Sequence, residues 1–127
     1  MATGISSYLA NKWLDAFGNN TSFAVTTVYM QLHVGDPGAN GTSNTATETT
    51  RKSVSFGAAS SGALSSDAQV QWTNIAGSQD ATHYSLWDAT SGGNFLGSGT
   101  ITANAYTAGD TLTFASGDID LSLTIAS

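Results

Sequence analysis

Apolar side chains recur at every second position through much of the chain, which is the pattern of β-strands with one buried face. Turn-forming residues interrupt this pattern every 8 to 12 residues or so, as in two-layered β folds. We therefore predict a mainly β protein, an antiparallel β-sandwich of jelly-roll-like form over about residues 23–126. The alternating segments are residues 23–34, 68–72, 84–88 and 111–114, and a final run with Ile119, Leu121, Leu123 and Ile125.

Two hairpins are predicted from turn residues that separate strand-forming runs. Gly92-Gly93-Asn94 lies between residues 84–88 and 95–101, and glycine readily adopts the positive φ that a short hairpin turn requires. Ser116-Gly117-Asp118 lies in the same way between residues 111–114 and the final alternating run. We expect the strands on either side of each turn to pair with one another.

Near the N-terminus the apolar spacing changes to that of a helix. Over about residues 5–17, apolar side chains fall three and four positions apart, and Gly18 follows where helices commonly end. Leu9, Trp13 and Phe17 form one apolar stripe along this helix. Such a stripe needs a partner, so we expect these side chains to pack against the sheet or against a neighbouring subunit.

A polar segment follows the first predicted strand. Gly35-Asp36-Pro37-Gly38 has the composition of a tight turn, and residues 39–50 are rich in Thr, Ser and Asn. Loops of this kind lie on protein surfaces and carry contacts to other molecules. We expect an exposed contact loop that includes Asp36, Pro37, Gly38, Asn40 and Arg51.

Length and charge limit the classes of protein that fit. The chain has 127 residues, enough for one domain, which we place at residues 1–127. Its net charge is −6 and its only basic residues are Lys12, Arg51 and Lys52, so binding to nucleic acid or to an anionic membrane is disfavoured. No cysteine and no membrane-spanning apolar run occur, and the N-terminus lacks a signal-peptide pattern. We expect synthesis in a cytoplasm.

The sequence contains no pattern that indicates catalysis. Gly97-Ser98-Gly99 lacks the spacing of a nucleophile elbow, and the single glutamate, Glu48, lies in the polar loop, where we expect solvent to surround it. His33 and His83 lie near aspartates without the spacing of a metal site, which favours structural hydrogen bonding. We therefore expect no enzyme activity, no metal and no cofactor. Tryptophans at strand and helix positions favour core packing over a sugar-binding platform.

Four blocks of sequence occur in an informative order. They are residues 32–38, then Arg51 with 54–59, then 83–89 with 92–96, then 108–114 with 117–118, preceded by residues 8–16 of the predicted helix. Together they resemble a family of small virion proteins of tailed bacteriophages, commonly labelled tail-fibre or minor structural proteins. The resemblance covers nearly the whole chain and implies a structural role in the virion, without catalytic residues to transfer.

Within that role, the absence of an extended repeat or coiled coil favours a compact subunit over a fibre shaft. We expect a homotrimer on the outer surface of the virion, made in the host cytoplasm, that binds the major capsid protein or tail proteins. Capsid decoration fits this shape best. The first alternative is a tail-fibre or minor tail protein used in host attachment, and the second is a carbohydrate-binding module.

Overall fold

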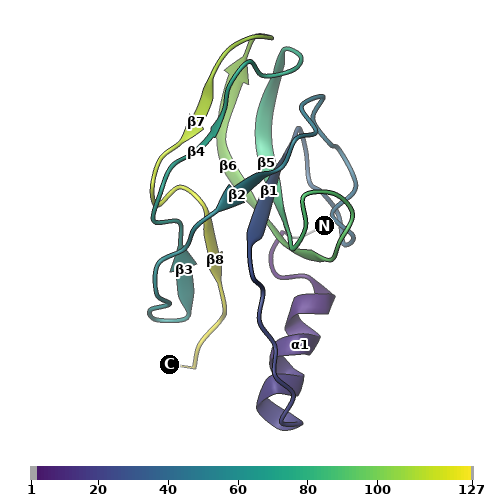
Figure 1. The fold of residues 1–127 in the computed structure, drawn as a ribbon, viewed down its shortest axis with the longest axis vertical. Helices are drawn as coiled ribbons and strands as arrows, with labels where there is room; N and C mark the ends of the chain where they lie inside the picture. The colour runs from purple at the N-terminus through teal and green to yellow at the C-terminus, as the bar shows by residue number, and fades with distance from the viewer. Residues whose placement is uncertain (1–2, 127) are drawn as a thin grey trace.

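The computed structural model describes residues 3–126 of the chain and shows one helix followed by short and long β-strands (Figure 1). The predictions of a mainly β, antiparallel fold and of one N-terminal helix are confirmed. In chain order the elements are α1 (Ser7–Gly18), β1 (Val28–His33), β2 (Lys52–Val54), β3 (Ala63–Ser65), β4 (Val70–Trp72), β5 (Gln79–Trp87), β6 (Phe95–Tyr106), β7 (Leu112–Phe114) and β8 (Asp120–Ser122).

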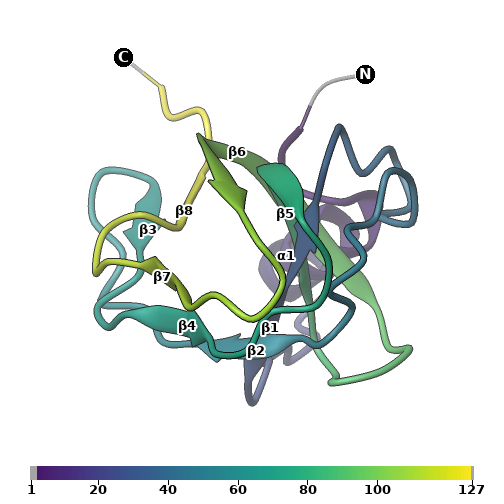
Figure 2. The ribbon, with the colours of Figure 1, turned by 90° about the horizontal axis from the view of Figure 1, so that it is seen from above.

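The strands form one four-stranded sheet and two ribbons. The sheet has the order β2-β1-β5-β6, while β3 pairs with β8 and β4 pairs with β7. β4 also lies beside β2, and β8 lies beside β6. Each ribbon therefore borders one edge strand of the sheet. Seen from above, the strands surround a common interior (Figure 2). The arrangement is sandwich-like and nearly closed, which leaves few free strand edges.

The first predicted hairpin is confirmed. β5 and β6 pair through the turn at Gly92 and Gly93, whose φ values are 63° and 75°. The carboxylate of Asp88 accepts hydrogen bonds from the backbone N–H and the side-chain amide of Asn94, at 2.7 and 2.9 Å. Burial alone would raise the pKa of Asp88, but these hydrogen bonds and the nearby Arg51 charge hold it below its ordinary value.

The hairpin predicted around residues 116–118 is wrong, because β7 pairs with β4 and β8 pairs with β3. Ser66 directs this turn. Its Oγ accepts hydrogen bonds from the backbone N–H groups of Gly117 and Ile119, at 3.1 and 3.2 Å. Ile119 is thereby placed in the core, where it is fully buried, and the chain after it reaches β3 instead of returning along β7.

The segment that follows β8 also differs from the prediction. The pairing between β3 and β8 ends at Ser122, and Leu123 and Ile125 are half exposed instead of lying on a buried face. The partner of β8 is β3, which lies outside the alternating segments that we predicted as strands. The short side chains before β3 gave no strand pattern, and the chain turns into β3 at Gly62, whose φ is 78°.

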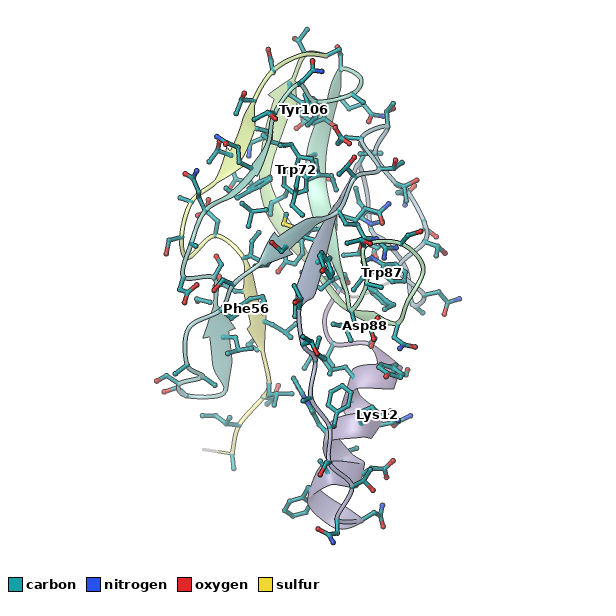
Figure 3. All side chains as sticks on the ribbon, in the orientation of Figure 1. Lys12, Phe56, Trp72, Trp87, Asp88 and Tyr106 are labelled. Atoms are coloured by element: carbon teal, nitrogen blue, oxygen red, sulfur yellow. The ribbon has the colours of Figure 1, made fainter. Side chains whose placement is uncertain are left out.

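The core is one cluster of apolar side chains between the sheet and the ribbons. Trp72 of β4 is fully buried in it (Figure 3). Its ring lies 5.9 Å from that of Phe114 in an edge-to-face arrangement, and its indole N–H donates to the carbonyl of Thr50 at 2.8 Å. The Tyr84 hydroxyl donates to the carbonyl of Asp120 at 2.6 Å, which connects β5 to β8. Edge-to-face aromatic pairs of this kind add specificity to hydrophobic burial.

Candidate assembly surface

Helix α1 contacts the body of the molecule mainly through its first turns. Ser6 is the N-cap, and its Oγ accepts the backbone N–H of Leu9 at 3.1 Å. The preceding residues add to the edge of β6, because the N–H of Ser6 donates to the carbonyl of Leu96. The predicted helix start at residue 5 is therefore two residues too early. Beyond its first turns the helix extends away from the sheets (Figure 1).

One side of the helix is covered by the chain that returns from it toward β1. Tyr8 packs edge-to-face on Phe23, with 6.2 Å between the ring centroids. Lys12 places its Nζ 5.6 Å from the centroid of the Tyr8 ring, and Figure 3 shows it directed away from the rest of the molecule. This side of α1 therefore has its partner within the chain.

The Trp13 side of the helix borders an apolar groove, which we define by two adjoining hollows among α1, the chain that returns from it and the β3–β8 ribbon. Their volumes are about 200 and 280 Å³. Trp13, Leu64 and Leu121 line both hollows. No lining residue among those that the structure describes is charged. The other lining residues are Ala59, Gly62, Ala63, Ser122 and Leu123 in the first hollow, and Leu9, Phe23, Ala24, Val25, Val28, Phe56, Leu86 and Leu96 in the second.

Large apolar side chains stand exposed near this apolar groove. Phe17 and Leu14, at the end of α1, are 92% and 65% exposed. On the other side, Leu123 and Ile125 follow β8 and are 50% and 56% exposed. Single exposed apolar side chains are ordinary, but several of them on the elements that border an apolar hollow are typical of a binding surface. This region is the candidate assembly surface of the protein.

The structure divides the predicted apolar stripe of the helix into three environments. Leu9 is buried in the core, Trp13 is half-buried and forms the wall of the apolar groove, and Phe17 is almost fully exposed. Of the two partners that we expected for the stripe, the sheet does not serve Phe17, because the helix leaves the body after Trp13. Packing of Phe17 against a neighbouring subunit stays a prediction.

The predicted contact loop is less exposed to solvent than its composition indicates. Pro37 is fully buried, Asp36 and Gly38 are half-buried, and only Asn40 is exposed. The Oδ1 of Asp36 accepts the backbone N–H of Gly38 at 2.8 Å. The expectation of an exposed loop is thus wrong for Pro37, and it is also wrong for Arg51.

Arg51 is half-buried and binds the β5–β6 turn to the sheet. Its Nε donates to the side-chain oxygen of Gln31 at 3.0 Å, and its Nη1 donates to the carbonyls of Ala89 and Gly92, both at 2.8 Å. The guanidinium carbon lies 4.1 Å from the centroid of the Trp87 ring, a cation–π contact. Arg51 is therefore a structural residue of the loop and not a free contact.

Glu48, which the sequence led us to place in solvent, is buried as well. Its two carboxylate oxygens accept the backbone N–H groups of Thr50 and Ala76, both at 3.1 Å. Burial would raise the pKa of Glu48, but these hydrogen bonds hold it below its ordinary value. The carboxylate thus connects the polar loop to the segment after β4 and has no free face for chemistry.

His33 takes part in a buried hydrogen-bond chain. Its Nδ1 lies 2.8 Å from the carbonyl of Ser43, so it carries the proton, and its Nε2 lies 2.7 Å from the Oγ of Ser85. The Trp87 indole N–H donates to the same Oγ at 2.7 Å. A serine next to a histidine is the beginning of a nucleophilic site, but both side chains are fully buried, so no substrate reaches them.

The second histidine does not complete a metal site. His83 lies opposite His33 across the β1–β5 pair, and its Nδ1 is 2.8 Å from the hydroxyl of Thr82. Within residues 3–126 no group of three or more His, Cys, Asp or Glu side chains is close enough to hold a metal ion. Over the same residues no helix is long and apolar enough to cross a membrane.

Sequence reasoning missed the ribbon side of the apolar groove. Leu64 lies outside the alternating segments that we predicted as strands, and Leu121 and Leu123 were expected on a buried face. The available signal was the final alternating run, which continues to Ile125 and is longer than residues 111–114, the partner that we predicted for it. The groove exists only because β3 and β8 pair beside the helix.

A comparison with curated proteins gave no match. A family model described as podophage GP4 fiber I protein gp80 matches residues 4–122. The matched region begins just before α1 and ends with β8, so it contains the helix and both strands of the ribbon that border the apolar groove. The chain therefore belongs to the podophage GP4 fiber I protein gp80 family, a tail-fibre-like family of tailed-phage virion proteins, as its sequence blocks indicated.

Proposed function

We propose that this protein is a non-enzymatic subunit of a phage tail fibre, which assembles as a homotrimer on the outside of the virion and joins it to other tail proteins. The observation that carries the proposal is the candidate assembly surface. A chain of this size buries most of its large apolar side chains, yet Leu14, Phe17, Leu123 and Ile125 remain exposed beside a groove without charged lining residues.

A structural role also agrees with the buried polar groups. Arg51, Glu48 and His33 are the side chains most able to perform chemistry, and each uses its hydrogen-bonding atoms to connect loops to the sheet. The Ser85–His33 pair is fully enclosed. Hydrogen bonds of this kind stabilise the fold, and these four side chains are therefore structural groups.

The location on the fibre is supported by the family, whose description names a fibre protein. Our sequence analysis favoured capsid decoration and kept the tail fibre as the alternative. The family description now favours the alternative, and a compact domain suits the attachment point or the end of a fibre. The acidic charge of −6 is compatible with either outer position, because both lie away from packaged DNA.

Phage particles that lack the protein separate these locations. An amber mutation in its coding sequence, grown on a non-suppressing host, should give particles that retain their DNA as wild type does on heating and chelation but adsorb poorly to cells. The same mutant grown on a suppressing host is the control and should adsorb normally. Particles that adsorb normally but release DNA on mild heating would instead support capsid decoration.

The purified chain provides the matched test of the carbohydrate-binding alternative. We expect no saturable binding to glycans isolated from the host surface when the protein is monomeric. Binding by the isolated chain, with no effect of its absence on virion composition, would favour a carbohydrate-binding module over a structural subunit.

A further inference from the structure

We propose that the occupant of the apolar groove is Phe17 from a second copy of this chain. The inference rests on the proposed role as an assembling subunit and names the partner of the candidate assembly surface. It assigns one donor side chain, Phe17, and one acceptor site, the hollow between Trp13 and the β3–β8 ribbon.

The donor is built by the helix. Phe17 is the penultimate residue of α1, one turn after Trp13, and this end of the helix extends away from the sheets (Figure 1). Its side chain is 92% exposed, and an aromatic side chain buries about 150–250 Å² when it is covered. Residues two positions apart on a helix point about 200° apart, so Asp15 lies on the opposite side. The carboxylate of Asp15 accepts a hydrogen bond from the side-chain amide of Asn19 at 2.9 Å.

The acceptor has the size of an aromatic ring. The two hollows of the apolar groove measure about 200 and 280 Å³, and an apolar protein cavity of about 150 Å³ accepts benzene. Trp13, Leu64 and Leu121 line both hollows and offer an aromatic face and two branched aliphatic side chains. A phenyl ring that enters here meets no charged side chain among the described lining residues.

The same chain cannot fill its own groove with Phe17, because Phe17 and Trp13 are fixed on one helix and Phe17 points into solvent. Donor and acceptor each occur once per chain, so a homo-oligomer satisfies all of them in equal numbers. A foreign partner that contacted only the apolar groove would leave Phe17 exposed.

Charge favours the same contact. The chain carries a net charge of −6, so two copies repel one another over most of their surfaces. The apolar groove and the Phe17 side of α1 avoid this repulsion because their described residues are uncharged.

Area indicates a closed assembly. A standard interface covers about 800 Å² on each partner, and Phe17 alone supplies about a quarter of this area. Leu14, Leu123 and Ile125, all at least half exposed, add to the contact. In a closed ring each copy is a donor on one side and an acceptor on the other, which doubles the area covered per copy.

Sedimentation equilibrium of the purified chain tests the contact. We expect the wild type to associate and Phe17→Asp to be monomeric at the same concentration, with an unchanged circular dichroism spectrum because Phe17 makes little contact within the chain. Val34→Asp is the matched control, since Val34 is a 38% exposed apolar residue outside the groove lining. A monomeric wild type, or association of Phe17→Asp equal to that of wild type, would overturn the inference.

Photo-crosslinking identifies the acceptor. Benzoylphenylalanine at position 17 keeps an aromatic side chain, and a mixture of light and heavy isotope-labelled copies distinguishes contacts between chains from contacts within one chain. Mixed-label adducts should fall on residues 59–64 or 121–123. Adducts only elsewhere on the second copy would overturn the inference. A monomeric wild type would also remove the homotrimer from the proposed function. Association through another surface, by a chain still found on the fibre, would overturn this inference alone and leave the proposed function intact.

Discussion

Replacing Arg51 by alanine tests the structural account most severely, because this side chain looked like an exposed contact residue in the sequence. In the structure its guanidinium donates three hydrogen bonds, to Gln31, Ala89 and Gly92, and lies on the face of Trp87. The substitution removes all four interactions together. It also leaves the side-chain oxygen of the buried Gln31 without this donor.

The magnitude follows from these contacts. Hydrogen bonds to charged groups contribute about 1.5–3 kcal/mol each, and water replaces part of this at the half-exposed guanidinium. The cation–π contact adds about 0.5–1 kcal/mol. Because the contacts share one group and are not additive, we expect Arg51→Ala to lower the free energy of unfolding by about 2–4 kcal/mol.

Urea unfolding followed by tryptophan fluorescence and by circular dichroism measures this change. For a slope of about 2 kcal/mol per molar, the midpoint should fall by about 1–2 M. Arg51→Lys keeps the charge without the planar group and should recover only part of the loss. Lys52→Ala removes the same charge one residue later and is the matched control. If Arg51→Ala and Lys52→Ala both changed stability by less than about 0.5 kcal/mol, the structural role of Arg51 would be refuted.

Three further predictions concern the core and the helix. Burial lowers the pKa of His33 below 6.5, so as the pH drops the unfolded chain is protonated before the folded one, and the free energy of unfolding should fall below pH 6.5. Urea midpoints at pH 7.5 and 5.5 should therefore differ in wild type and converge in His33→Gln, and equal midpoints in wild type would contradict this. Gly99→Ala should lower the free energy of unfolding by about 1–3 kcal/mol, because a Cβ would lie 2.6 Å from Cζ of Tyr84. The control Gly18→Ala, whose Cβ would meet nothing within 4 Å, should be tolerated, and equal melting temperatures of the two variants would count against the packing of Tyr84 on Gly99. Trp13→Ala should cost about 1–3 kcal/mol, below the usual range for a fully buried tryptophan, since Trp13 is half-buried in the monomer; a change of less than about 0.5 kcal/mol in unfolding experiments would show that the helix is not packed on the body.

Local patterns predicted the elements whose causes are local. Alternation identified β1, β4, β7, β8 and much of β5, and the helical spacing together with Gly18 located α1 to within two residues at its start and one at its end. The turn at Gly92 and Gly93 was predictable because only the glycine backbone adopts two successive positive φ values readily. These features depend on neighbours within a few residues.

Features that depend on distant residues were not predictable from the sequence. The pairing of β8 with β3 depends on Ser66, whose hydroxyl holds the turn before β8. Arg51 and Glu48 lie in a polar segment that we expected to be exposed. Each instead makes hydrogen bonds with the backbone of a distant segment, Arg51 with the carbonyl of Ala89 and Glu48 with the N–H of Ala76. Phe17 carries the same apolar signal as Leu9, and only the direction of the helix relative to the sheet separates the exposed residue from the buried one.

The proposed location on the tail fibre is tested most directly by labelling intact virions. Antibodies against the purified chain, coupled to gold and viewed by electron microscopy, should bind at the tail fibres, with particles that lack the protein as the unlabelled control. Labelling at the fibres would support the assignment of this chain as a fibre subunit. Gold distributed over the whole capsid, with the fibres unlabelled, would contradict it.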